Sequence, residues 1–110
     1  MPISTKPWGD ISEADYADAA DYCGACLVDL NETGQPKTKA ACHLPVYEPK
    51  AMGRALNRNA VGAVAAVLAG ARGGVNIPPA AKKQAARKLM RLYGEAEMPP
   101  PPSLKALAGQ

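Results

Sequence analysis

The strongest constraint on this fold is residues 57–93, which read as two helices with contrasting surfaces. Residues 59–72 (NAVGAVAAVLAGAR) are small and apolar and carry no charge before Arg72. A helix with no polar face has to be covered on most sides by other parts of the chain or by a partner. Residues 79–93 are amphipathic and basic. We therefore predict a central antiparallel pair of helices, 59–72 and 79–93.

Glycine, proline and asparagine residues mark the ends of these helices. Gly73–Gly74 is predicted to end the first helix in the left-handed conformation. Pro78–Pro79 suits the start of the second helix, because proline is tolerated in a first turn. Gly94 is predicted to end the second helix, and either Asn57 or Asn59 can cap the first.

The rest of the chain adds short elements around this pair. Ser12 is predicted to cap a helix over about residues 13–22, and a turn at 31–36 predicts a β-hairpin over about residues 26–46. Ser103 is predicted to cap a last helical turn at 104–108. The predicted fold is thus mainly α, with an N-terminal arm (1–11), a single globular domain (12–98) and a Pro-rich tail (99–110).

Composition limits the core and divides the charge. Among 110 residues there is no Phe, one Trp and four Tyr, so a core of Ala, Val and Leu buries little area per residue. Every charged residue from Asp10 to Glu32 is acidic, whereas bases dominate from Lys37 onward. The two segments can complement each other within one chain or between copies. This pattern favours such pairing over nucleic-acid binding.

Targeting signals and cysteine usage point to a protein made in the cytoplasm. No stretch approaches the roughly 20 apolar residues that span a bilayer, and residues 1–8 lack the apolar core of a signal peptide. Three cysteines are an odd number, which argues against a closed disulfide framework and for a reducing compartment. We expect no membrane partner.

The clearest candidate for chemistry is a set of cysteines and one histidine. Cys23-x-x-Cys26 can place two thiolates on one zinc ion, and the hairpin would return Cys42 and His43 to complete a tetrahedron. Adjacent ligands are awkward, however, because neighbouring side chains on a strand point to opposite faces. Two interpretations stay open: a Zn²⁺ site, or small buried thiols beside a surface histidine and no cofactor.

A second candidate is the basic face of residues 79–93. Lys83, Arg87 and Arg91 recur every four residues, a spacing that can follow a nucleic-acid backbone or simply form a solvated or acid-pairing face. The second interpretation is favoured. Trp8 is too apolar to stay exposed without a reason, so we expect it to pack on the domain or on a neighbour. These four residues are the predicted partner-binding residues.

No enzyme is predicted. The glycines of 70–74 lack the Gly-Lys-Ser/Thr ending of a phosphate-binding loop. His43 has no serine or carboxylate at a recognisable spacing for a catalytic triad. The acidic residues resemble a solvated surface, with no apolar pocket to shift their pKa values.

Part of the chain resembles a known family. The matching segments are Leu44-Pro45-Val46, Asn57-Arg58-Asn59-Ala60-Val61, residues 68–75 (LAGARGGV), Ala85-Ala86-Arg87-Lys88-Leu89 through Tyr93, Pro99-Pro100 and Ser103-Leu104. Together, from Cys26 to Ser103, they resemble a small helical domain of tailed-bacteriophage head proteins. In that family the domain occurs alone or attached to prohead protease or minor capsid products.

The resemblance implies a structural protein of the virion without catalytic residues. We expect a decoration or cement protein that binds the capsid shell, with the major capsid protein and copies of itself as partners. Its location would be the virion, after synthesis in the host cytoplasm. The alternative is a small nucleic-acid-binding protein stabilised by zinc.

Overall fold

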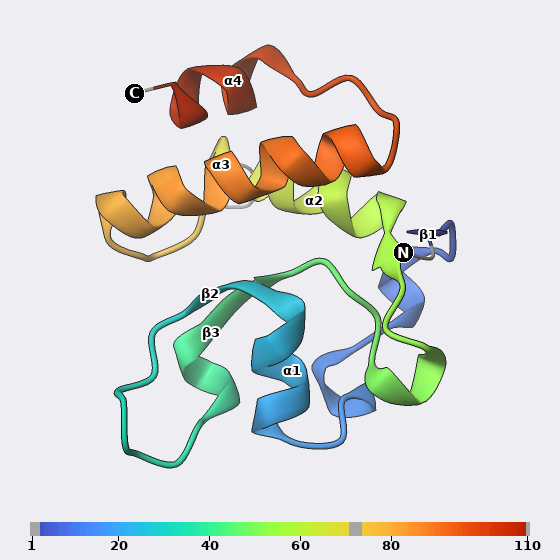
Figure 1. Cartoon of the computed structure of the whole chain (residues 1–110), viewed down its shortest axis with the longest axis vertical. Coiled ribbons are helices and arrows are strands. Elements are labelled where there is room, and N and C mark those ends of the chain that lie inside the picture. Colours follow the sequence, from blue (N-terminus) through green and yellow to red (C-terminus); the bar gives the residue numbers. More distant parts are fainter. Residues whose placement is uncertain (1–2, 71–73, 110) are drawn as a thin grey trace. The chain divides into compact units, whose positions relative to one another are not determined.

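The computed structural model describes residues 3–70 and 74–109 (Figure 1). These residues form two units, Met1–Ala60 and Val61–Gln110, each of which is described by itself. The boundary lies within the predicted single domain 12–98 and inside helix α2 (Arg58–Leu68). In the part of the chain that is described, the structure is mainly helical, with one short antiparallel sheet, as the sequence predicts.

The predicted β-hairpin is confirmed in the first unit. Strands β2 (Cys26–Asp29) and β3 (Cys42–Pro45) are antiparallel, and Val28 pairs with His43. The turn rich in Gly, Pro and Asn between them reverses the chain. Val28 and Leu44 are buried in the core of this unit.

The helix before this hairpin begins later than predicted. Ser12 and Asp15 do form a capping box, in which the Ser12 amide donates to Asp15 Oδ2 over 2.8 Å. That box caps only a single 3₁₀ turn, Glu13–Asp15. Helix α1 (Ala19–Ala25) has a cap of its own, because the Asp18 side chain accepts a hydrogen bond from the Asp21 amide. The second N-cap in the sequence, and not the first, therefore sets the start of α1.

The N-terminal arm is held by strand β4 (Leu56–Asn57). Strand β1 (Ile3–Ser4) pairs with it in parallel. The buried Asn57 donates from Nδ2 to the Lys6 carbonyl over 3.1 Å and to Glu48 Oε2 over 2.9 Å. Its Oδ1 accepts from the Ala60 amide, so Asn57, of the two candidates, caps α2. Asn59 Nδ2 instead donates to the Lys6 carbonyl over 2.8 Å.

Helix α2 ends four residues earlier than predicted. Its last residue is Leu68, and Gly70 takes the left-handed conformation with φ +107°. The Gly70 amide donates to the Val67 carbonyl over 3.0 Å. Gly70 therefore ends this helix before Gly73–Gly74 is reached, because it is the first glycine after Leu68 and takes the left-handed conformation without a Cβ penalty. Arg72 and Gly73 lie outside the described residues.

Helix α3 (Pro79–Glu95) matches the predicted basic helix, and α4 (Pro102–Ala108) packs against it. Leu89 of α3 and Leu104 of α4 are almost fully buried. The predicted cap of α4 is wrong, because Pro102 opens this helix and Ser103 is already inside it. Antiparallel pairing of the two central helices stays a prediction.

The end of α3 is a Schellman motif that its sequence does not announce. The Met98 amide donates to the Tyr93 carbonyl over 2.9 Å, and the Glu97 amide donates to the Gly94 carbonyl over 3.2 Å. Glu97 has φ +57°, in the left-handed region where this motif normally places glycine. Gly94, which was predicted to end the helix, lies within it. Main-chain hydrogen bonds thus hold a glutamate where glycine is preferred.

This geometry predicts opposite effects of one substitution at two nearby glutamates. Glu97→Gly should raise the free energy of unfolding by about 1 kcal/mol, because glycine removes the Cβ penalty of the left-handed conformation. Glu95→Gly, in the last helical turn, is the matched control and should lower it by roughly 0.5–1 kcal/mol. Urea unfolding followed by circular dichroism measures both. Destabilisation by Glu97→Gly would contradict the assigned end of α3.

Candidate functional site

A disulfide joins α1 to β3 in the first unit. Cys23 of α1 and Cys42 at the start of β3 are both buried, with Cα atoms 5.4 Å apart and a bond between their Sγ atoms. This corrects the expectation of a chain without disulfides. An odd number of cysteines shows only that at least one stays unpaired, and it says nothing about the other two.

The structure does not bring the four predicted zinc ligands together. Cys23 lies in α1 whereas Cys26 begins β2, so the Cys-x-x-Cys segment is split between a helix and a strand. His43 follows Cys42 on β3 and therefore points to the opposite face. Among the residues that the structure describes, the one group of three side chains able to hold a metal is Cys23, Asp29 and Cys42.

Cys26 is the free cysteine, and its environment keeps the thiol protonated. It is half-buried, and burial raises its pKa to about 12, against a hydrogen bond with Tyr22 that lowers the pKa. A thiol with so high a pKa is a poor nucleophile and a poor metal ligand at neutral pH. The tyrosine is itself packed edge to face on Tyr16, with ring centroids 5.1 Å apart.

Asn31 lies at the centre of the polar groups around the disulfide. Its Nδ2 is 3.3 Å from Cys42 Sγ and 3.6 Å from Cys23 Sγ. The same nitrogen is 2.7 Å from Asp29 Oδ1 and 3.2 Å from the Thr38 carbonyl. Asn31 Oδ1 accepts from the Thr38 amide over 2.9 Å, which fixes the orientation of the amide.

Sequence reasoning missed Asp29 and Asn31 as members of this site. In the sequence, Asp29 belongs to the acidic segment and Asn31 to the predicted turn. The predicted hairpin brings these strands together, but the pairing of Asp29 with Cys42 follows only from the register seen in the structure. In an antiparallel pair, directly opposite residues have neighbouring side chains.

Asp29 is held in its ionised form. An ion pair and hydrogen bond with Lys37 and hydrogen bonds from the Asn31 amide and side chain lower its pKa from 3.8 to about 2. The carboxylate is therefore charged throughout the neutral range and offers electron pairs beside the two sulfurs.

A buried ion pair supports the other end of α1. Asp21, only 4% exposed, pairs with Arg54, and the Arg54 Nη1 donates to the Asp21 carbonyl over 3.0 Å. Burial opposes the charge, but amide donors from Ala17 and Lys50, together with the Arg54 charge, lower the pKa of Asp21. Because every charge is compensated, this pair has the character of a structural link between α1 and the loop before β4.

The predicted partner-binding residues differ in their exposure and in their contacts. Arg87 Nε donates to the Ala108 carbonyl over 3.1 Å, so this side chain caps the end of α4. Arg91 is exposed and makes no ion pair with any described residue, while Lys83 is half-exposed at the rim of a cavity of about 370 Å³ that Leu107 also lines. Trp8 is half-buried in a 3₁₀ turn, Trp8–Asp10. Two of the three predicted basic residues, Lys83 and Arg91, are therefore at least partly exposed, whereas Arg87 is hydrogen-bonded within its own unit.

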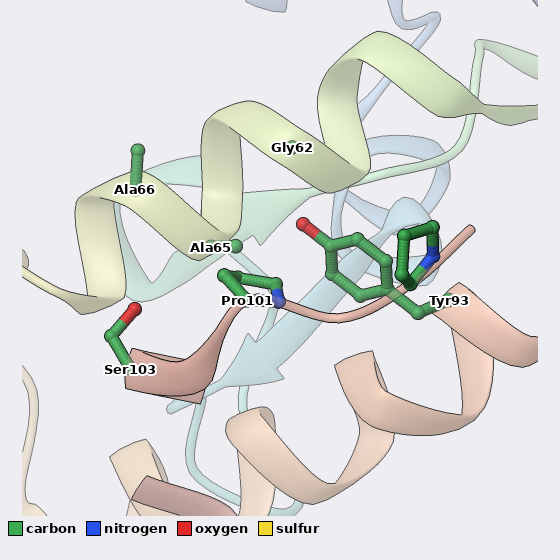
Figure 2. Close-up of a pocket in the computed structure, with 7 residues that line it drawn as sticks. Gly62, Ala65, Ala66, Tyr93, Pro101 and Ser103 are labelled. Atoms are coloured by element: carbon green, nitrogen blue, oxygen red, sulfur yellow. The ribbon is translucent and has the colours of Figure 1, made fainter. Parts of the chain in front are cut away.

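Another cavity of about 370 Å³ in the second unit is lined by small residues, prolines and Tyr93 (Figure 2). Gly62, Ala65 and Ala66 come from α2, and Figure 2 shows the Tyr93 hydroxyl pointing toward that helix. Burial raises the pKa of Tyr93, so its hydroxyl stays protonated. No carboxylate, histidine or cysteine is among the described lining residues, and the side-chain polar groups there are the hydroxyls of Tyr93 and Ser103.

Comparison with known proteins gives no assignment. No protein-family model, curated protein or solved structure matches the chain. Within residues 3–70 and 74–109, every helix is too short or too polar to cross a bilayer.

The disulfide predicts a large effect of removing its two cysteines. Cys23 and Cys42 are 19 residues apart, and closing a loop of that length stabilises a fold by about 3 kcal/mol through the unfolded state. The Cys23→Ser, Cys42→Ser double variant should lose about this amount in urea unfolding, whereas the control Cys26→Ser should lose much less. Equal effects of the two variants would contradict the assigned pairing.

The carboxylates predict loss of stability in acid. A carboxyl whose pKa is lowered by folding stabilises the fold above its unfolded pKa, and this contribution is lost as the pH falls through the folded pKa. For Asp29 the window runs from about pH 4 down to about pH 2. The midpoint temperature of thermal unfolding, measured across that window, should fall less steeply with decreasing pH in Asp29→Asn than in the wild type.

Asp10→Asn is the control for this experiment, because the Asp10 side chain forms no hydrogen bond or ion pair with a described residue. An Asp29→Asn variant with the same pH dependence as the wild type would show that the carboxylate is not held as described.

Proposed function

We propose that this protein is a non-enzymatic structural protein of a phage virion, which binds the capsid shell as a decoration or cement protein. The observation that carries the proposal is the resemblance of residues 26–103 to the small domain of tailed-phage head proteins. The proposal requires no cofactor. Its partners are the major capsid protein and further copies of this chain.

The distribution of exposed charge supports a binding role. Glu13, Asp18 and Glu32 are exposed on the first unit, and Arg91 is exposed on the second. Surfaces of opposite sign on two parts of one small protein can orient it between acidic and basic neighbours. This is what a protein that sits between repeated subunits requires.

The bonds between distant segments of the chain support a structural, non-catalytic role. The disulfide, the Asp21–Arg54 pair and the Asn57 hydrogen bonds each join segments far apart in the sequence. Neither cavity described above contains a carboxylate, histidine or cysteine among its described lining residues. A stable scaffold with charged surfaces fits a cement protein better than a catalyst.

A nucleic-acid-binding role is the second candidate, and the exposed side of α3 is the observation that favours it. Lys83 and Arg91 are available there, whereas Arg87 is engaged with the end of α4. A short row of cations on one helix whose tyrosine, Tyr93, is buried gives weak, strongly salt-dependent binding. We therefore rank this role second.

The decisive experiment measures the protein on purified heads. Mass spectrometry of virions should find the chain in many copies per particle, and heads assembled without it should release DNA at lower temperature than heads that carry it. Adding back the purified protein should restore the wild-type temperature. Heads that never contain the protein and are equally stable would overturn the proposal.

Retention on DNA separates the second candidate from the first. The structural role predicts little retention at low salt and no change in Arg91→Ala. Strong retention that is lost at moderate salt, and that Arg91→Ala weakens, would favour the nucleic-acid role instead.

A further inference from the structure

Several electron-pair donors gather around the disulfide. Two sulfurs, Asp29 Oδ1 and the Thr38 carbonyl all lie within 3.6 Å of Asn31 Nδ2. A primary amide has only two hydrogens to donate. Four electron-pair donors thus converge on one point, and although Asp29 Oδ1 also accepts from the Asn31 main-chain amide, their convergence suits a cation.

The side chains also have the spacing of metal ligands. The ligand atoms of Cys23, Asp29 and Cys42 all lie within 4.8 Å of one another. Zinc bonds of about 2.3 Å to sulfur and about 2.0–2.2 Å to oxygen place tetrahedral ligands roughly 3.5–3.8 Å apart. Small side-chain adjustments are therefore enough once the sulfur–sulfur bond is broken.

We propose that the Cys23–Cys42 disulfide, when reduced, becomes a zinc site in which both thiolates and the Asp29 carboxylate bind one Zn²⁺ ion. The Thr38 carbonyl or a water takes the fourth position. This inference does not depend on the proposed virion role, and it differs from the sequence prediction because Asp29 replaces Cys26 and His43.

The chemistry is a two-electron exchange with a dithiol reductant. The dithiol transfers two electrons and two protons to the sulfurs, which become the thiols of Cys23 and Cys42, and is itself oxidised to a cyclic disulfide. Binding of Zn²⁺ then releases both thiol protons to solvent, because thiolates are the metal ligands. The Asp29 carboxylate is already ionised and releases none.

The charge around the site suits this assembly. Two thiolates and one carboxylate on Zn²⁺ leave a net charge of −1. Lys37, which pairs with Asp29, supplies a compensating positive charge from the surface. Asn31 remains beside the ligands as a hydrogen-bond donor, the role that outer groups have at zinc centres. The site thus has ligands, charge balance and support from the same hairpin.

The test uses the full chain, which is reduced with dithiothreitol. The dithiothreitol is then removed under anaerobic conditions. Titration with Zn²⁺ against a chromophoric chelator should give one ion per chain. In the folded protein, bound zinc should protect two of the three thiols from a thiol-specific reagent, so that only Cys26 reacts. Co²⁺ in place of Zn²⁺ should give the visible absorption of tetrahedral thiolate coordination, and the oxidised protein should bind neither ion.

Variants identify the ligands. Cys23→Ser and Cys42→Ser should abolish binding, and Asp29→Asn should weaken it by at least the roughly 10- to 100-fold that loss of a mere outer partner costs. Cys26→Ser and His43→Ala are the controls and should bind as tightly as the wild type. If these controls lose zinc while Asp29→Asn keeps it, the four-residue set predicted from the sequence is right and the proposal is overturned.

Folding is followed by circular dichroism in the same samples. If the reduced protein is unfolded without metal, Zn²⁺ should restore the helical spectrum, as metal binding and folding are coupled at such sites. A reduced wild-type protein that binds no zinc, folded or unfolded, would overturn the proposal.

Discussion

The disulfide between Cys23 and Cys42 is the constraint on which the first unit depends. It fixes the last turns of α1 to the first residue of β3, and so holds the helix across the hairpin. A core of Ala, Val and Leu with few aromatic residues supplies limited burial energy, and small domains of this kind gain most from a covalent link. The link also brings Asp29 and Asn31 to the two sulfurs, which creates the candidate site.

Two polar clusters join further segments of the first unit. The Asp21–Arg54 pair ties α1 to the loop before β4, while Asn57 joins the N-terminal arm, Glu48 and the start of α2. Each cluster is buried and satisfied, since no buried side-chain nitrogen or oxygen of the described residues lacks a partner. Removing one partner from such a cluster lowers the free energy of unfolding by more than the hydrogen bond itself contributes, because the other group stays buried and unpaired. The first unit therefore has a specific arrangement despite its modest core.

Local signals in the sequence were sufficient for the elements but not for their ends. The hairpin and α3 follow from turn residues and amphipathic spacing, which act within a few residues. The ends of α2 and α3 differ from the prediction for one reason: several nearby residues compete to end a helix, and the main-chain hydrogen bonds that form in the last turn decide among them. Gly70 precedes Gly73–Gly74, and Glu97, rather than Gly94, takes the left-handed position after α3.

The sequence predicts two of the residues of the candidate site and misses the others. The sequence predicts Cys23 and Cys42 as ligands, but it adds Cys26 and His43 to them only because they are neighbours in sequence. Strand pairing supplies the partner that spacing cannot, since it places Asp29 directly opposite Cys42. The pairing of cysteines depends on where α1 ends and β3 begins, and those boundaries were the least predictable part of the fold.

Peptide mapping without reduction tests the central claim most directly. Protease digestion of the protein purified under alkylating conditions, followed by mass spectrometry, should yield one linked species that joins the Cys23 and Cys42 segments. Cys26 should carry the alkyl group. A chain with all three cysteines alkylated, or with Cys26 in the linked species, would contradict this account of the fold and of the site built on it.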